Sequence, residues 1–136
     1  MTRILIDSGL LIALFDGSDN HHQPAKNFIK NNTAELVTSL ASITETLYLL
    51  DFNRHAQLDF LDWVQKGAVT IAPIENSDLS RIRTLIEKYQ DLPMDFADAC
   101  LVYLGETLDI DQIATIDRDF SIYRIKGRKA FKLVLQ

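Results

Sequence analysis

Arg3-Ile4-Leu5-Ile6-Asp7-Ser8 contains a short apolar run that ends in an acid and a hydroxyl residue. Such a run predicts a buried strand over residues 3–6. The stretch that follows at once, residues 8–15, has a helical pattern for which Ser8 is a candidate N-cap. A strand that passes directly into a helix is the repeating unit of a parallel sheet, so this stretch decides the fold class.

The same alternation continues along the chain. Further strands are predicted at residues 35–38, 69–72, 113–115 and 131–135, the last at a sheet edge, and further helices at 22–31, 42–51, 54–66, 77–89 and, opened by Pro93, 93–108. The strands are uniformly apolar, which indicates helices on both faces of a parallel sheet. We therefore predict a single domain over residues 1–136, an α/β fold built as a three-layer α/β/α sandwich around a central, mostly parallel five-stranded sheet.

Composition narrows the class of protein further. The single cysteine, Cys100, excludes an internal disulfide framework and a multi-cysteine zinc site, and it is expected to be a small core residue. No apolar run approaches the length that crosses a bilayer. The first apolar stretch is also too short, and too soon followed by an acid, for a signal peptide. We predict a soluble, cytoplasmic protein without membrane contact.

The charge is unevenly distributed along the chain. The net charge is −5, which argues against non-specific electrostatic binding of nucleic acid by the chain as a whole. From residue 118 onward, however, six basic residues and one acid give +5, so residues 1–117 carry −10. Two interpretations stay open: a solvated surface around the last strand, or a basic rim that holds a phosphate backbone. The candidates for substrate binding on such a rim are Arg118, Arg124, Lys126 and Arg128.

Four acids fall at one edge of the predicted sheet. Asp7 follows the first strand and Asp117 the fourth, Glu45 lies about one turn into the helix after the second strand, and Asp98 lies just inside the helix that Pro93 begins. Ligands of parallel sheets gather at the carboxyl ends of the strands. Carboxylates that lie close together raise one another's pKa values unless a cation compensates them, and Mg²⁺ or Mn²⁺ prefers such oxygen ligands.

Each acid taken singly has a structural alternative. These are an N-cap of the first helix for Asp7, an Asx-turn with Asp119 for Asp117, an exposed helix position for Glu45 and a favourable helix-start charge for Asp98. The shared edge of the sheet, more than any single position, favours a metal site.

Five segments along the chain carry recognisable motifs. They are ILIDSGLLIALFD (4–16), DNHH (19–22), TETL (44–47), DLPMDFADA (91–99) and IATIDRDF (113–120), which holds a T-x-D-x-D-F pattern. Together, and in this order, they resemble the PIN-domain family, and the closest branch is the VapC-type toxins of bacterial type II toxin–antitoxin pairs. The resemblance covers nearly the whole chain.

The resemblance implies a PIN-like fold and a metal-dependent endoribonuclease that hydrolyses RNA phosphodiester bonds. It also implies a cognate antitoxin protein as partner and a homodimer. Asp7, Glu45, Asp98 and Asp117 would be catalytic and would hold one or two Mg²⁺ or Mn²⁺ ions. Asp95, one turn before Asp98, is a further candidate ligand or a helix cap. Ser8 and Thr115 would be supporting hydroxyls that orient a carboxylate or a bound water.

Three other functions compete with this one. A structure-specific DNA nuclease of the same fold group needs a helical arch, for which this chain is short. A haloacid-dehalogenase-like phosphatase needs a second Asp two residues after the first, where this chain has Gly9. A PIN-like RNA-binding or scaffold module without catalysis is disfavoured by the complete acidic set.

Aromatic and leucine side chains on the third and fourth helices are expected to lie mostly in the core. They are Tyr48, Phe52, Leu58, Phe60, Leu61 and Trp63. Some of the aromatic side chains could instead form an exposed apolar groove for the antitoxin or for a second copy of the chain.

Overall fold

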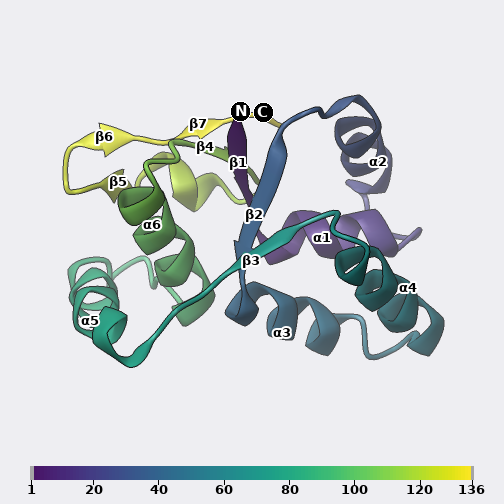
Figure 1. Cartoon of the computed structure of the whole chain (residues 1–136), viewed down its shortest axis with the longest axis horizontal. Coiled ribbons are helices and arrows are strands. Elements are labelled where there is room, and N and C mark those ends of the chain that lie inside the picture. The colour runs from purple at the N-terminus through teal and green to yellow at the C-terminus, as the bar shows by residue number, and fades with distance from the viewer. Residues whose placement is uncertain (1, 136) are drawn as a thin grey trace.

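The computed structural model describes residues 2–135, and five parallel strands form its central sheet (Figure 1). Their order across the sheet is β3-β2-β1-β4-β7. The strands are β1 (Arg3–Ile6), β2 (Glu35–Ser39), β3 (Thr70–Ala72), β4 (Gln112–Ala114) and β7 (Lys132–Leu133). The predicted five-stranded parallel sheet is confirmed, and the last strand lies at an edge. The single domain over residues 1–136 stays a prediction, and its first and last residues lie outside the described range.

Six α-helices cover the two faces of this sheet. They are α1 (Ser8–Phe15), α2 (His22–Asn31), α3 (Leu40–Leu49), α4 (Arg54–Gln65), α5 (Leu79–Lys88) and α6 (Phe96–Leu108), with short 3₁₀ turns η1 (Asn76–Asp78) and η2 (Arg118–Ser121). Figure 1 shows α5 and α6 on one side of the strands and α1, α2 and α4 on the other. The arrangement is the predicted three-layer α/β/α sandwich.

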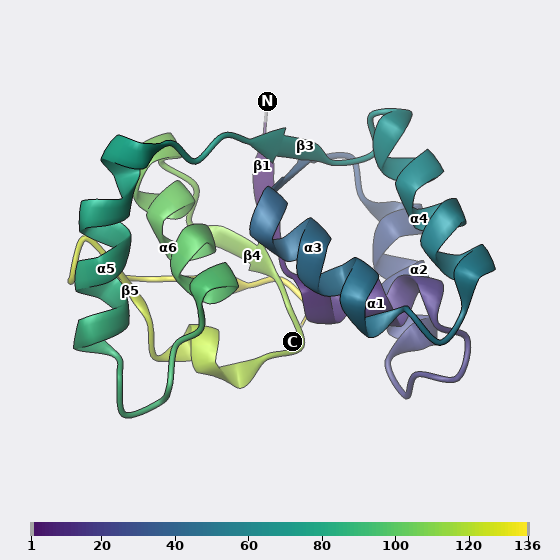
Figure 2. The same cartoon turned by 90° about the horizontal axis from the view of Figure 1, so that it is seen from below.

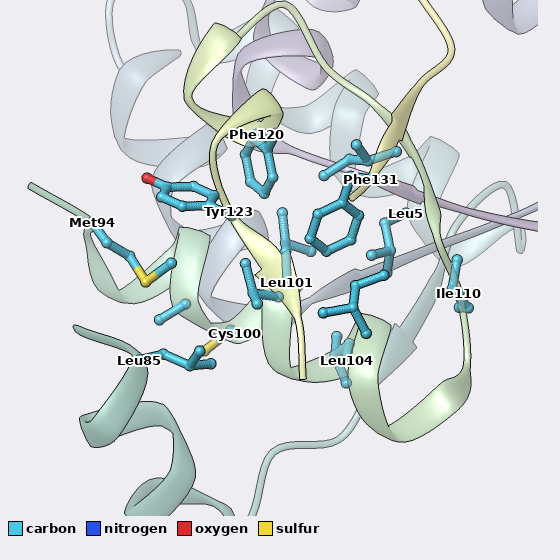
Figure 3. Close-up of a cluster of buried hydrophobic side chains, with 14 of the residues drawn as sticks. Leu5, Leu85, Met94, Cys100, Leu101, Leu104, Ile110, Phe120, Tyr123 and Phe131 are labelled. Atoms are coloured by element: carbon cyan, nitrogen blue, oxygen red, sulfur yellow. The ribbon is translucent and has the colours of Figure 1, made fainter. Parts of the chain in front are cut away.

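Alternate residues of the strands point into two separate hydrophobic cores, one on each face of the sheet. Leu5 and Val37 point into the core on the α5–α6 side. Figure 3 shows Leu5 within this cluster. Cys100 lies buried in this core, as predicted. Ile4 and Ile6 point instead into the core on the α1–α4 side. Because successive strand residues face opposite sides, apolar strands of this kind require helices on both faces.

The parallel register aligns the carboxyl ends of the strands. Ile6 of β1 pairs with Ala114 of β4, and Val37 of β2 pairs with Thr70 of β3. The residues that follow these strands therefore meet at one edge of the sheet. Figure 2 shows α3 and α6 side by side near this edge, and the two helices are in contact.

One predicted cap and one predicted helix start were wrong. α1 begins at Ser8 as predicted, but Asp7 caps it, because the Asp7 side chain accepts from the Leu10 N–H. This is the alternative given for Asp7. The helix expected from Pro93 begins at Phe96 after the cap Asp95, whose backbone is extended. Both errors have one cause: a cap needs an extended backbone and an oxygen aimed at the first turn, which a residue type alone does not guarantee.

A two-stranded hairpin near the C-terminus was not predicted from the sequence. β5 (Arg124–Ile125) pairs antiparallel with β6 (Lys129–Ala130). Lys126 and Gly127 in its turn both have positive φ angles, 53° and 73°. Positive φ at both central residues is the mark of a type I′ turn, which Asn-Gly signals far more clearly than Lys-Gly.

Several large apolar side chains lie at the surface instead of in the core. Tyr48 is 72% exposed and Phe52 63%, and Leu58 and Leu61 are also exposed. On α4 the buried positions are Ala56 and Phe60. The expectation that Leu58 and Leu61 point inward was wrong. Among the helices in the described range, none is both long and apolar enough to span a membrane.

Candidate active site

Asp7 lies at the end of β1, buried beneath the carboxyl edge of the sheet. Its Oδ1 atom accepts from the Leu10 N–H at 3.2 Å, and its Oδ2 atom accepts from the Thr115 hydroxyl. The Thr115 hydroxyl in turn accepts from the backbone N–H of Asp117 at 2.9 Å. One hydroxyl thus joins the acid after β1 to the acid after β4.

Glu45 comes to the same place from α3. Its Oε1 atom accepts a hydrogen bond from the Ser8 hydroxyl, and Ser8 is itself buried. Since Ser8 follows Asp7 directly, this contact holds Glu45 beside the end of β1. Both predicted supporting hydroxyls, on Ser8 and Thr115, therefore donate to predicted acids, while their functional role stays a prediction.

Asp98 lies in the first turn of α6. The turn is capped by Asp95, whose Oδ1 atom accepts from the Asp98 N–H at 2.8 Å. Among residues 2–135, the Asp98 carboxylate has one side-chain partner, the hydroxyl of Tyr123, whose oxygen lies 3.4 Å from Oδ2. The capping role considered for Asp95 is therefore present, which commits one of its oxygens to the helix start.

Asp117 is the N-cap of η2, and its Oδ1 atom accepts from the Asp119 N–H at 2.9 Å. This is the Asx-type turn considered as an alternative for the residue. The turn does not remove Asp117 from the acidic edge, because its backbone N–H remains bonded to Thr115. Phe120 is fully buried and anchors the loop.

Burial and like charge combine to disfavour ionisation at this edge. Burial, partly offset by hydrogen bonds from Thr115 and Leu10, raises the pKa of Asp7 from 3.8 to about 6. Burial also raises the pKa of Asp98 to about 7, with added repulsion from Asp95, Asp117, Asp7 and Glu45. Mutual repulsion of this kind shows that the acids lie within electrostatic reach of one another. Within residues 2–135, none of the four predicted acids forms an ion pair with a basic side chain.

The donor set fits a hard divalent cation in ligand type and in charge. As the side chains stand, no group of three or more His, Cys, Asp or Glu residues in the described range is arranged to hold a metal ion. Two of the carboxylates, Asp7 and Glu45, are turned toward the hydroxyls of Thr115 and Ser8. Oxygen ligands that lack basic partners suit Mg²⁺ or Mn²⁺, because positive charge would relieve the repulsion that raises their pKa values.

Comparison with known sequences decides the family. The family described as PIN domain matches residues 4–126. The chain belongs to the PIN-domain family. This PIN domain is 28% identical over 134 residues to Ribonuclease VapC26 of Mycobacterium tuberculosis, covering 96% of the chain and 99% of that protein.

Two solved structures resemble this PIN domain in fold. The crystal structure of Mycobacterium tuberculosis VapC20, described as a sarcin–ricin loop cleaving toxin, superposes with a TM-score of 0.80 at 19% identity, covering 88% of this chain and 93% of that one. A toxin–antitoxin complex from Klebsiella pneumoniae contains a chain that superposes with a TM-score of 0.64 at 18% identity, covering 85% and 87%. The predicted PIN-like fold is thereby confirmed.

The basic residues of this PIN domain are not gathered in one rim. Arg118 follows Asp117 directly and starts η2. Arg124 donates from Nη1 to the backbone carbonyls of residues 121, 122 and 123. Lys126 and Arg128 belong to the turn of the β5–β6 hairpin, whose strand β5 contacts α6 (Figure 1). Their predicted role in substrate binding stays a prediction, and Arg118 is the one adjacent in sequence to the acids.

The last two lysines lie near the amino end of β4, away from the carboxyl ends of the strands. Lys129 and Lys132 pair with Asp111 at 3.0 and 3.7 Å, and Asp111 directly precedes β4. Asp117 and the acids near it lie instead beyond the carboxyl end of β4. These two lysines therefore cannot form part of a basic rim beside the acids, although they supply part of the positive charge counted in the sequence.

Proposed function

We propose that this PIN domain is a metal-dependent endoribonuclease of the VapC toxin type, which hydrolyses RNA phosphodiester bonds in the cytoplasm. The observation that carries the proposal is the meeting of four acids, without basic partners, at the carboxyl edge of a parallel sheet: Asp7, Glu45, Asp98 and Asp117. The relative named as a ribonuclease, which matches over nearly the full length of both chains, supports RNA as substrate.

In this proposal the four acids hold Mg²⁺ or Mn²⁺, and Asp95 caps α6 and remains a candidate ligand through its second oxygen. When bound, the cation supplies positive charge that stabilises the phosphate in the transition state and makes the attacking water more acidic. Thr115 and the Leu10 N–H fix both oxygens of Asp7, and Ser8 fixes Glu45. Ligands held in this way need little reorganisation before they act.

An antitoxin would cover the exposed apolar side chains of α3 and α4. We call them the α3–α4 patch: Tyr48, Leu49, Phe52, Leu58 and Leu61. Apolar side chains spread along two helices suit an amphipathic helix of a partner, and exposed acids at Asp51 and Asp59 favour basic residues on that partner's flanks. A relative of the same fold was solved as a toxin–antitoxin complex, which supports this partner.

A homodimer is part of the same proposal, through a second apolar surface. A groove near the carboxyl end of β3 is bounded by the exposed side chains of Leu40, Ile71, Leu79 and Phe96. Exposed apolar side chains gathered in this groove, apart from the α3–α4 patch, favour a second contact surface. Leu79→Glu should give a monomer by light scattering, whereas Phe52→Glu should leave the dimer intact.

The experiment that tests the nuclease uses the purified chain without antitoxin. We expect a labelled RNA pool to be cut with Mg²⁺ or Mn²⁺, cutting to stop with EDTA, and Asp98→Asn to abolish it. The control is Glu87→Gln, which removes an exposed acid outside the cluster and should cut normally. Cleavage of DNA in place of RNA would contradict the substrate, and RNA binding without cleavage would contradict the enzyme.

A further inference from the structure

Three of the acids each face one hydroxyl. Glu45 accepts from Ser8 and Asp7 accepts from Thr115, as the preceding sections describe. For Asp98 the hydroxyl belongs to Tyr123, at 3.4 Å. The sequence motifs pointed to the hydroxyls of Ser8 and Thr115, whereas Tyr123 lies outside the T-x-D-x-D-F pattern and was not predicted.

The protein core fixes the position of the Tyr123 side chain. The residue is fully buried, and its ring meets the rings of Tyr89 and Phe120 edge to face, with centroids 5.0 and 5.1 Å apart. Figure 3 shows its oxygen at the margin of the apolar cluster, pointing away from Phe120. Edge-to-face contacts on two sides restrict the ring, so the hydroxyl is presented at one place.

The Tyr123 hydroxyl donates a hydrogen bond to the Asp98 carboxylate. A carboxylate only accepts hydrogen bonds, so the tyrosine is the donor in this contact. Its nearest acceptor is Asp98, whose side chain accepts from no other donor in the described part of the chain.

We propose that Tyr123 is a positioning residue, whose hydroxyl holds Oδ2 of Asp98 from the core side and leaves the other carboxylate oxygen for the cation. The proposal rests on the metal-dependent function proposed above. The Asp95 cap orients only the backbone of Asp98, so without Tyr123 the carboxylate would lose the one hydrogen bond that the described residues donate to it. A ligand that must be ordered on binding gives a weaker site.

The test is Tyr123→Phe, which removes one oxygen and keeps the buried ring. By calorimetry on metal-free protein, we expect Mn²⁺ affinity to fall about three- to tenfold. Losing a hydrogen bond to a metal ligand usually costs more affinity than this. The loss is smaller here because the Tyr123 and Asp98 oxygens lie 3.4 Å apart, which is long for a hydrogen bond. We expect kcat to fall by a similar factor and KM for RNA to stay within about twofold, because a buried tyrosine does not contact substrate.

Two comparisons separate positioning from a general structural role. Tyr89→Phe removes the neighbouring buried hydroxyl, which accepts from the Arg124 N–H, and should lower stability without changing Mn²⁺ affinity. In an Asp98→Asn background, Tyr123→Phe should cause no further loss of affinity, since the two residues act through one contact.

The outcomes distinguish this inference from the proposed function. If the wild-type chain binds Mn²⁺ and cuts RNA, but Tyr123→Phe matches it in both, Tyr123 has no positioning role and the nuclease stands. If Tyr123→Phe and Tyr89→Phe weaken Mn²⁺ binding equally, the effect is structural and the inference is also overturned. If the wild-type chain binds no Mn²⁺, both proposals fail together.

Discussion

The Thr115 hydroxyl donates to Oδ2 of Asp7 across a separation of 108 residues. The two residues directly follow strands that pair in parallel, with Ile6 opposite Ala114. Asp7 and Thr115 each lie one residue beyond the paired residues Ile6 and Ala114, so their side chains are neighbours. This contact gives the buried acid a donor, and through the Asp117 N–H it ties the two strand-end acids together.

Thr115→Val should weaken the site while preserving the side-chain shape. Asp7 is left with an unpaired buried oxygen, which costs about 1–3 kcal/mol when the group is ionised. We expect a lower free energy of unfolding at pH 8 and weaker Mn²⁺ binding by calorimetry. Thr44→Val is the control, because its hydroxyl bonds to the Leu40 carbonyl at an exposed position. Equal effects of the two substitutions would contradict the prediction.

Asp7→Asn should abolish RNA cleavage and yet stabilise the metal-free protein. The pKa of Asp7 is raised to about 6 mainly by burial, so its charge opposes folding at pH 8. Asparagine removes the charge and keeps an oxygen that can cap α1. We expect a gain on the order of 2 kcal/mol, or a rise in Tm of several degrees. A fall in Tm would show that the charge does not oppose folding.

The metal-free protein should become more stable as the pH falls from about 8 to about 5. Asp7 and Asp98 have folded pKa values of about 6 and about 7, above the 3.8 of an unfolded chain. The folded state therefore binds protons more tightly in this window, and the free energy of unfolding rises as they bind. The penalty is complete above the folded values and absent below 3.8.

Urea unfolding at several pH values, in EDTA and at constant ionic strength, measures this dependence. Below about pH 4 the trend should reverse, because the pKa values of Asp16, Asp78 and Asp111 are lowered in the folded chain and their protonation costs stability. Asp7→Asn should flatten the slope between pH 5 and 7. A wild-type curve that falls steadily from pH 8 to pH 5 would contradict the raised values.

Gly105→Ala should destabilise the fold although glycine is a poor helix former. Alanine inside a helix usually gains about 1 kcal/mol over glycine. Here a Cβ atom would lie 2.9 Å from the Ile110 carbonyl oxygen and 3.0 Å from the Phe131 ring. We expect a net loss of about 1–3 kcal/mol from this overpacking, seen as a lower Tm.

The matched control for Gly105→Ala is Gly17→Ala, where a Cβ atom would meet nothing within 4 Å. Its effect should stay within about 0.5 kcal/mol, as for most surface changes. Neither substitution should alter Mn²⁺ affinity, because both positions lie outside the acidic cluster. A stabilised Gly105→Ala protein would show that the α6–Phe131 contact is looser than the structure has it.

Arg118→Ala should weaken RNA binding more than Lys132→Ala does. Arg118 follows Asp117 at the acidic edge, whereas Lys132 pairs with Asp111 before β4. For Arg118→Ala we expect KM to rise about threefold or more and the slope of log affinity against log salt to shrink by about one. Equal effects of the two substitutions would indicate that RNA lies across both edges of the sheet.

The positions of Asp7 and Asp117 were predictable because they depend on short-range patterns. Each follows an apolar run, and parallel strands end at one edge whatever their exact length. Glu45 was harder, because a helix residue can face any direction, and only its bond with Ser8 shows where it points. The start of α6 was misplaced because Pro93 and Asp95, two residues apart, both signal a helix start, and only Asp95 bonds to the first turn.

The inward face of α4 was not predictable from periodicity. Leu58 and Leu61 form one apolar stripe, while Ala56 and Phe60 belong to another. Propensity does not choose between two stripes, because the choice depends on which neighbours are available to pack. Phe60 is buried because Phe15 of α1 meets its ring edge to face at 5.5 Å.

The sequence by itself determined the strand–helix alternation, the parallel sheet and the edge at which the acids collect, since these follow from periodicity and chain direction. Only the tertiary structure decided which donor each carboxylate receives and which apolar face stays exposed. Tyr123 and Asp98 illustrate the difference, because their contact joins a helix start to an irregular segment 25 residues later. Such contacts depend on packing in three dimensions, and no local pattern in the chain encodes them.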